Sequence, residues 1–198
     1  MSTTTKQLDV SVFPQEQHYV LADGTVLEMK QTLETYYEVF QQLVAQGLLN
    51  GNDNFGFAMA KPVEELDFKL HKHHNKPDKF VWFVGGWGPN RDRYIANAIR
   101  KMRPLLRPEP DMPIVDTSTL DFRFNDPKHF RKVVDSEQEE GVYQWGDFPY
   151  GGAVLAQYGP LILIGATSGF TEMQDDMVTR MILGGLGEQI VSTHGWLQ

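Results

Sequence analysis

The sequence predicts one domain of the α+β class, in which an antiparallel sheet packs helices against one face. Short strand-like runs outnumber helical segments, and most neighbouring strands are joined as hairpins. In addition, 198 residues of which 41% are hydrophobic are enough to bury one sizeable core. We therefore interpret residues 1–198 as a single domain, with a flexible tail at 1–9, a hairpin extension at 10–30 and the core at 31–191.

Composition narrows the classes of function. A formal net charge of −8 argues against a nucleic-acid-coating protein, whose affinity comes from Lys and Arg side chains that neutralise phosphates. The lack of cysteine excludes a disulfide scaffold, a thiol nucleophile and an iron–sulfur cluster. The chain starts with polar residues unlike a signal peptide, and its most apolar run, Leu161–Ile164, is far shorter than the about 20 residues of a membrane helix. We expect a cytoplasmic protein with no nucleic acid and no membrane among its partners.

The first elements expected along the chain are a hairpin and a long helix. Asp23-Gly24 separates two β-prone runs, 19–21 and 25–27, and both turn residues tolerate positive φ, which is typical of a hairpin. Apolar residues at helical spacing then predict a helix over 31–46, closed by Gly47. The residues at this spacing are Leu33, Tyr36, Tyr37, Phe40, Leu43 and Val44.

Strands and a second helix are expected next. Alternating residues predict short strands at 55–59 and 66–70, and the apolar run Phe80–Val84 predicts a strand at the centre of the sheet, buried on both faces. A helix is predicted to begin after Asn90, its N-cap, and to end or kink at Pro104, which lacks a backbone donor. Its expected inward residues are Tyr94, Ile95, Ala98, Ile99 and Met102.

The last third of the chain begins with an insertion at about 104–141. Within it we expect extended pieces at 113–115 and 120–124, and a short helix after Asp126-Pro127. A hairpin of two strands, 153–158 and 161–165, follows around Gly159-Pro160, with the second strand fully buried.

The closing helix is predicted to begin with the capping box Thr171-Glu-Met-Gln174 and to run to about 191. Its apolar residues at helical spacing begin with Met173, Met177 and Met181. Three glycines, at 184, 185 and 187, each disfavour this helix by about 1 kcal/mol relative to alanine. Either the helix breaks near Leu183, or the missing side chains allow another backbone to approach closely.

The most specific motif joins the last hairpin to the closing helix. The run Gly165-Ala-Thr-Ser-Gly-Phe-Thr-Glu-Met-Gln-Asp175 passes from a strand through a Ser-Gly turn into a helix start, and Gly151-Gly152 precedes it. This pattern resembles the GlcG and HbpS-like family of haem-binding or haem-degrading domains, to which the C-terminal domains of PduO-type proteins also belong. The residues that carry the resemblance are Gly151, Gly152, Gly165, Ser168, Gly169, Thr171, Gln174 and Asp175.

The resemblance implies a homo-oligomer that binds haem or a similar planar small-molecule ligand. On this hypothesis, amides at the start of the last helix bind a propionate or phosphate together with Ser168, Gly169 and Thr171, beside Gly151 and Gly152. Nearby carboxylates would repel such an anion unless they point away. The alternative interpretation is purely structural, because the same residue types make a strand-to-helix turn with a good cap.

Two further groups are candidates for ligand contact. Arg91 and Arg93 open a segment that holds a third of the basic residues, and such a cluster suits haem propionates or an acidic partner. Its alternative is the solvated face of a helix. His71 and His73 would share one face of a strand and could bind a metal or cap a haem iron. A solvated polar loop is the alternative there.

Three hypotheses of function therefore stay open. The leading one is a haem or tetrapyrrole-like cofactor-binding protein, and the second is a non-catalytic, self-assembling structural or adaptor protein on the same fold. Aromatic residues in excess of one small core favour assembly. They are Trp82, Trp87, Tyr143, Trp145 and Tyr150. The third is an enzyme acting on a small oxidised substrate or flavin, for which sequence spacing supplies no acid–base pair or nucleophile.

Overall fold

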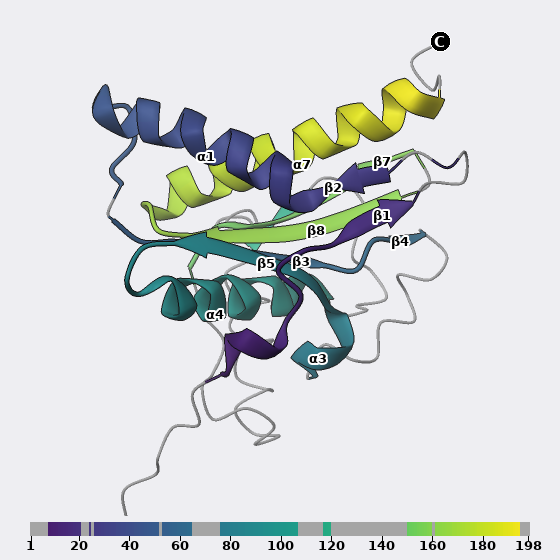
Figure 1. Cartoon of the computed structure of the whole chain (residues 1–198), viewed down its shortest axis with the longest axis horizontal. Coiled ribbons are helices and arrows are strands. Elements are labelled where there is room, and N and C mark those ends of the chain that lie inside the picture. Colours follow the sequence, from purple (N-terminus) through teal and green to yellow (C-terminus); the bar gives the residue numbers. More distant parts are fainter. Residues whose placement is uncertain are drawn as a thin grey trace, which may run out of the picture.

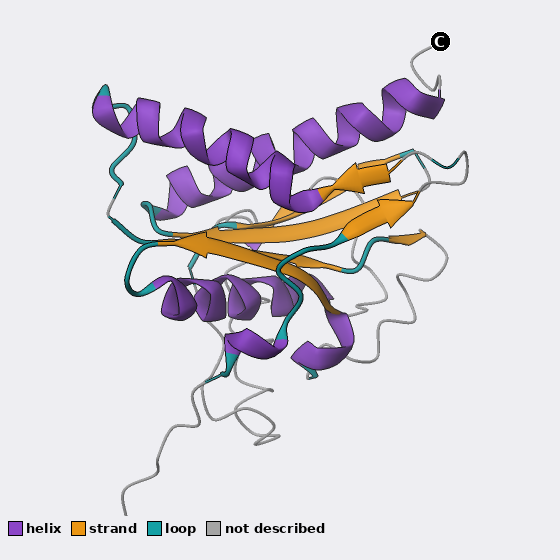
Figure 2. Ribbon diagram, viewed as in Figure 1, coloured by secondary structure: helices purple, strands orange, loops and turns teal. Residues whose placement is uncertain are grey.

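An antiparallel sheet forms the middle layer of the protein, and helices cover both of its faces (Figures 1 and 2). The computed structural model describes residues 8–20, 24, 26–51, 53–64, 76–106, 117–119, 150–159 and 161–194. In these ranges the strand order is β5-β3-β8-β7-β6, and β4 pairs with β8 off this path. The strands are β3 (Phe55–Ala60), β4 (Val63–Glu64), β5 (Val81–Trp87), β6 (Thr117–Ser118), β7 (Ala153–Tyr158) and β8 (Leu161–Ser168).

The two faces of this sheet pack against different helices. In β3, Phe57 and Met59 belong to the apolar cluster of α1 (Met29–Ala45) and α7 (Glu172–His194), whereas Ala58 belongs to that of α4 (Arg91–Met102). The predicted α+β class with an antiparallel sheet is confirmed. The expectation of helices on one face is wrong, because every residue of β3 and β8 is buried and each apolar face needs its own cover.

The predicted N-terminal hairpin is present as a small sheet of its own. β1 (His18–Val20) pairs with β2 (Val26–Glu28) in antiparallel register. It follows a short 3₁₀ helix, η1 (Val10–Val12), and packs on the face that carries α1 and α7. The predicted hairpin is therefore confirmed by its strand pairing, whereas residues 21–23 and 25 of its turn lie outside the described residues.

The strand β5 lies at one end of the strand order, so its predicted central place is wrong; β8 lies between β3 and β7 instead. The N-terminal extension supplies cover that the apolar run requires. Pro14 accepts a hydrogen bond from the backbone of Val84 (2.8 Å), and Tyr19 packs edge-on against Trp82. The N-terminal extension therefore covers the apolar residues of β5, although this strand lies at the end of the strand order.

The bounds of β5 also differ from the prediction. Phe80 belongs to a short helix, α3 (Pro77–Phe80), and the strand continues through Gly85 and Gly86. Gly86 pairs with Gly56 of β3, and a side chain at Gly56 would collide with the backbone of α4. These glycines stay in the sheet because they let α4 lie directly on it.

The long first helix ends as the sequence predicts. α1 begins two residues earlier than expected, at Met29, and ends at Ala45. Gly47 has φ 72, and its amide donates to Val44 at 2.9 Å while the Leu48 amide donates to Leu43 at 2.9 Å. Both bonds together form a Schellman cap.

The helix α4 also follows its prediction in its bounds and in its inward face. Asn90 occupies the N-cap position, although its side chain makes no capping bond. After Met102 the chain tightens into a 3₁₀ turn, η2 (Arg103–Leu106), which accommodates Pro104. Its buried apolar residues are Ile95, Ala98, Ile99 and Met102.

The closing helix α7 is continuous, so neither explanation of its glycines holds as stated. Side chains, not a backbone, fill the space: a Cβ at Gly185 would collide with Tyr36, and one at Gly187 would collide with Tyr158. Met173 and Met177 are 70% and 42% exposed. The residues that α7 buries in the core are Val178, Ile182, Leu183, Leu186 and Ile190.

Several predictions fall outside the described residues. They are the strand at 66–70, the extended pieces at 113–115 and 120–124, the helix after Asp126-Pro127, and both histidines of the candidate metal pair. Among the helices that the structure describes, none combines the length and apolar character needed to cross a bilayer.

Candidate functional site

The glycine- and hydroxyl-rich motif surrounds a buried ion pair. Lys101 of α4 donates from Nζ to Asp175 Oδ2 of α7 at 2.6 Å and to the carbonyl of Thr167 at 2.9 Å. The two charged side chains are 2% and 4% exposed. Asp175 Oδ1 also accepts from the amide of Phe170 at 3.0 Å. The pair therefore ties helices from opposite faces of the sheet to the end of β8.

Hydroxyl groups complete this network. Thr167 donates from Oγ1 to the carbonyl of Asp175 at 2.7 Å, and Thr179 donates to the carbonyl of Gly152 at 2.7 Å. Gly152 has φ 119, and a Cβ there would lie 2.7 Å from the Asp175 side chain and 3.0 Å from Lys101 Nζ. A side chain at position 152 is thus excluded by both backbone conformation and space.

Burial governs the protonation of this pair. It raises the pKa of Asp175 to about 6, against the opposing effect of the adjacent Lys101 charge. Burial also lowers the pKa of Lys101, again opposed by its partner. Both directions have one cause, because a low-dielectric surrounding disfavours each charged form. With so little exposure, the pair holds elements together and offers no surface to a ligand.

The amides of Phe170 and Thr171, which precede α7, already donate to side chains of that helix. The amide of Phe170 donates to Asp175, and the amide of Thr171 donates to Gln174 Oε1 at 3.5 Å. The second bond is the backward half of the predicted capping box. Ser168 is 5% exposed at the end of β8, and Gly169 packs closely on the carbonyl of Asn54.

Arg91 and Arg93 lie at the opposite end of α4 from the buried pair. Arg91 and Arg93 are exposed in the first turn of α4, where Arg91 lies 3.4 Å from Asp92. Lys101, which contacts Gly152, lies in the last turn of the same helix. Ten residues of helix separate the two ends by about 15 Å. The arginines are therefore remote from Lys101, whereas Asn54 lies against Gly169 and accepts from the amide of Asn90, which precedes Arg91.

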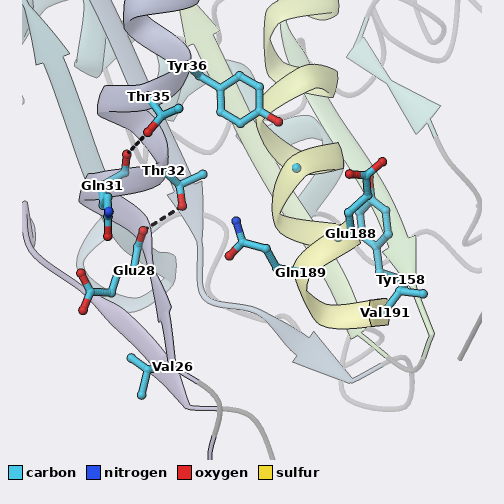
Figure 3. A pocket seen from close by; sticks show the side chains of 12 residues that line it. Val26, Glu28, Gln31, Thr32, Thr35, Tyr36, Tyr158, Glu188, Gln189 and Val191 are labelled. Atoms are coloured by element: carbon cyan, nitrogen blue, oxygen red, sulfur yellow. Dashed lines mark hydrogen bonds between the residues drawn. The ribbon is translucent and has the colours of Figure 1, made fainter. Parts of the chain in front are cut away.

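A large groove lies elsewhere, across the glycine tract of α7 (Figure 3). It has a volume of about 1120 Å³, slightly above the range of about 300–1,000 Å³ that is usual for small-molecule sites. Side chains of α1 and β2 form one flank, and Tyr158 and Glu188 stand at the other (Figure 3). Residues of chemical interest along it are Thr32, Thr35, Tyr36, Tyr158, Glu188 and Gln189.

Tyrosines and glycines give this groove its shape. Tyr36 lies over Gly185 and Tyr158 lies over Gly187, so Gly185 is half-buried and Gly187 is buried beneath the two phenol rings. Gly184 has only the Tyr158 hydroxyl nearby, at 3.9 Å from its Cβ position. The sequence signalled this region through its three helical glycines, but it did not indicate which aromatic side chains would meet them.

The threonines and carboxylates of the groove act as acceptors, whereas the amides of Gln31 and Gln189 both donate and accept. Thr32 and Thr35 donate their hydroxyl protons to carbonyls of their own helix, at 2.9 and 3.0 Å, which leaves oxygen lone pairs for other contacts. Burial and the charge of Glu188 raise the pKa of Tyr36, which therefore stays a neutral phenol. The lining includes the carboxylates Glu28 and Glu188, and no Lys, Arg or His is among its described residues.

No protein-family model, curated protein or solved structure matches this chain. Within the described ranges, no cluster of three or more His, Asp or Glu side chains is arranged to hold a metal ion. The groove and the buried pair are therefore interpreted from their own chemistry.

Proposed function

We propose that this protein binds a planar organic ligand in the groove between α1 and α7. The observation that carries the proposal is a groove of about 1120 Å³ in which Tyr36 and Tyr158 pack onto the glycine tract of α7. Phenol rings pack well against planar molecules. Ligand sites commonly combine such apolar surfaces with a few polar groups.

The resemblance to the GlcG and HbpS-like family makes haem the first ligand to test. A tyrosine phenol is among the side chains that can ligate haem iron, and two phenols line the groove. When bound, haem would supply an iron centre with redox and ligand-binding chemistry. This proposal puts the ligand in the groove because the buried pair of Lys101 and Asp175 fills the corner of the sequence motif.

The test is a titration of haemin into the purified full chain, followed by absorbance. Thr35→Trp and Gln189→Trp fill the groove from α1 and from α7, and Glu38→Trp places the same side chain on the exposed surface of α1 outside the groove. We expect the Soret band to shift with the wild type and with Glu38→Trp, and binding to be lost in both groove variants. No shift at micromolar haemin would remove haem, and equal binding by all four proteins would remove the groove.

A second candidate function, self-assembly, is favoured by exposed apolar side chains at one end of the molecule. The C-terminal end of α1 and the start of α7 lie together there (Figure 1). Gln174 links them by accepting from the Asn50 amide at 3.1 Å. The apolar residues exposed at this end are Val44, Leu48, Met173 and Met177. We propose that a second copy of the chain covers this surface, as the family resemblance implies.

Light scattering on the eluting protein tests this second candidate. The double variant Leu48→Glu, Met173→Glu is expected to be monomeric at concentrations where the wild type is a dimer or larger. Val12→Glu is the control, because Val12 is 67% exposed elsewhere on the molecule. A monomeric wild type would contradict the proposal.

A further inference from the structure

We propose that the groove selects organic cations, that is, planar ligands that carry an ammonium, guanidinium or pyridinium group. This inference rests on the proposed function, a planar ligand in the groove, and it predicts that a cationic ligand binds more tightly there than haem, whose two propionates are negative. It follows from three properties of the groove: its fixed charges, the direction of its hydrogen-bonding groups, and its aromatic faces.

The fixed charges of the groove are negative. The lining has four titratable groups among the described residues. They are Glu28 at the end of β2, Tyr36 of α1, Tyr158 of β7 and Glu188 of α7. The basic side chain on the neighbouring turn of α1, Lys30, is held 2.6 Å from Glu16 in the adjacent hollow. Within the described lining, a cationic ligand therefore meets attraction, whereas a carboxylate or phosphate meets repulsion.

The threonine hydroxyls and the carboxylates favour a ligand with N–H donors, whereas Gln31 and Gln189 can both donate and accept. The hydroxyl protons of Thr32 and Thr35 are directed to helix carbonyls, so their oxygens accept from other molecules. The Glu188 carboxylate is exposed and can only accept at neutral pH. A ligand rich in N–H donors satisfies these acceptors, and an anionic ligand leaves them without donors.

Two phenol rings add a third attraction for the same ligand class. Tyr36 and Tyr158 stand on the two sides of the α7 backbone at Gly185 and Gly187. A cation placed over a phenol face is attracted to the negative face of the ring, and Arg-like or ring-borne cations also stack on it. Glu188 lines the same groove as both tyrosines, so a ligand in the groove can combine an aromatic and a charged contact.

Two metal-free porphyrins of similar size and opposite peripheral charge test the inference. One carries four N-methylpyridinium groups and the other four sulfonatophenyl groups, and each is titrated by its Soret absorbance at low and at physiological ionic strength. Glu188→Gln removes a charge from the groove, and Glu38→Gln removes the same formal charge from exposed α1 outside the groove.

We expect the wild type to prefer the cationic porphyrin. Glu188→Gln should weaken its binding by about fivefold, the effect of one charge a few ångström away in water, and Glu38→Gln should change it little. If both porphyrins bind equally and both are displaced by Thr35→Trp, the groove remains a ligand site and the selectivity is refuted. If neither binds, the proposed function fails with it. Equal weakening by both glutamine variants would assign the preference to the net charge of −8 instead of the groove.

Discussion

Replacement of Lys101 by methionine tests whether the buried pair holds α4 and α7 together. The two charged side chains are 2% and 4% exposed, so Lys101→Met leaves the Asp175 carboxyl in a dry site with one amide donor. Breaking a buried pair on one side typically lowers the free energy of unfolding by about 3–5 kcal/mol. We expect a loss of this size near neutral pH, measured by urea unfolding with an unchanged m-value.

The pH dependence of this loss has a definite sign. Burial holds the pKa of Asp175 at about 6 in the folded wild type, above its usual 3.8, so the folded state keeps a proton that the unfolded state has released. Stability therefore falls as pH rises from about 4 to about 6, by about 3 kcal/mol for this group. Without the Lys101 charge the pKa of Asp175 rises further, so in Lys101→Met the stability continues to decrease up to a higher pH. The deficit of Lys101→Met should thus be smallest near pH 5 and grow toward neutrality.

A second substitution separates charge from shape. Asn at position 175 keeps the size of the side chain and an acceptor for the Phe170 amide but carries no charge. The double variant Lys101→Met, Asp175→Asn should therefore recover much of the stability that Lys101→Met loses near neutral pH. If Lys101→Met is as stable as the wild type, or if its deficit is the same at every pH and in the double variant, the reasoning is refuted.

Three glycine substitutions test the packing by thermal and urea unfolding. Gly184→Ala should raise the unfolding free energy by about 1 kcal/mol, because its Cβ meets nothing closer than 3.9 Å. Gly185→Ala should lower the unfolding free energy, because the Tyr36 hydroxyl must move to make room for the new methyl group. Equal gains in stability from Gly184→Ala and Gly185→Ala would show that Tyr36 does not rest on α7. Gly56→Ala should lower the unfolding free energy by about 1–3 kcal/mol or more, because the obstacle is the α4 backbone; a neutral result would place α4 farther from the sheet.

Local signals predicted the elements well where one short stretch contained the whole cause. The hairpin at Asp23-Gly24, the cap at Gly47 and the end of α4 at Pro104 each depend on backbone conformations of neighbouring residues. The place of β5 in the sheet does not depend on neighbouring residues, because an N-terminal segment far away in sequence covers the edge of this strand. An apolar run reports burial, but it does not report which part of the chain provides it.

The candidate sites also combine features that neighbouring residues determine with features that distant segments determine. The glycine- and hydroxyl-rich motif was located correctly from the sequence, yet its interpretation as a ligand corner required open amides and nearby arginines. The fold turns Asp175 inward to Lys101 and leaves Arg91 at the far end of α4. Orientation about a helix and the distance between elements decide such questions, and neither is encoded in a motif's spacing.

The amino-acid sequence alone determined the α+β class, the turns and caps, and the presence of glycines that no isolated helix would favour. Only the tertiary structure decided that Tyr36 and Tyr158 meet those glycines and that Glu188 lines the same groove. The physical reason is that backbone preference acts between neighbours in the chain, whereas a groove is made by side chains from separate elements that packing brings together.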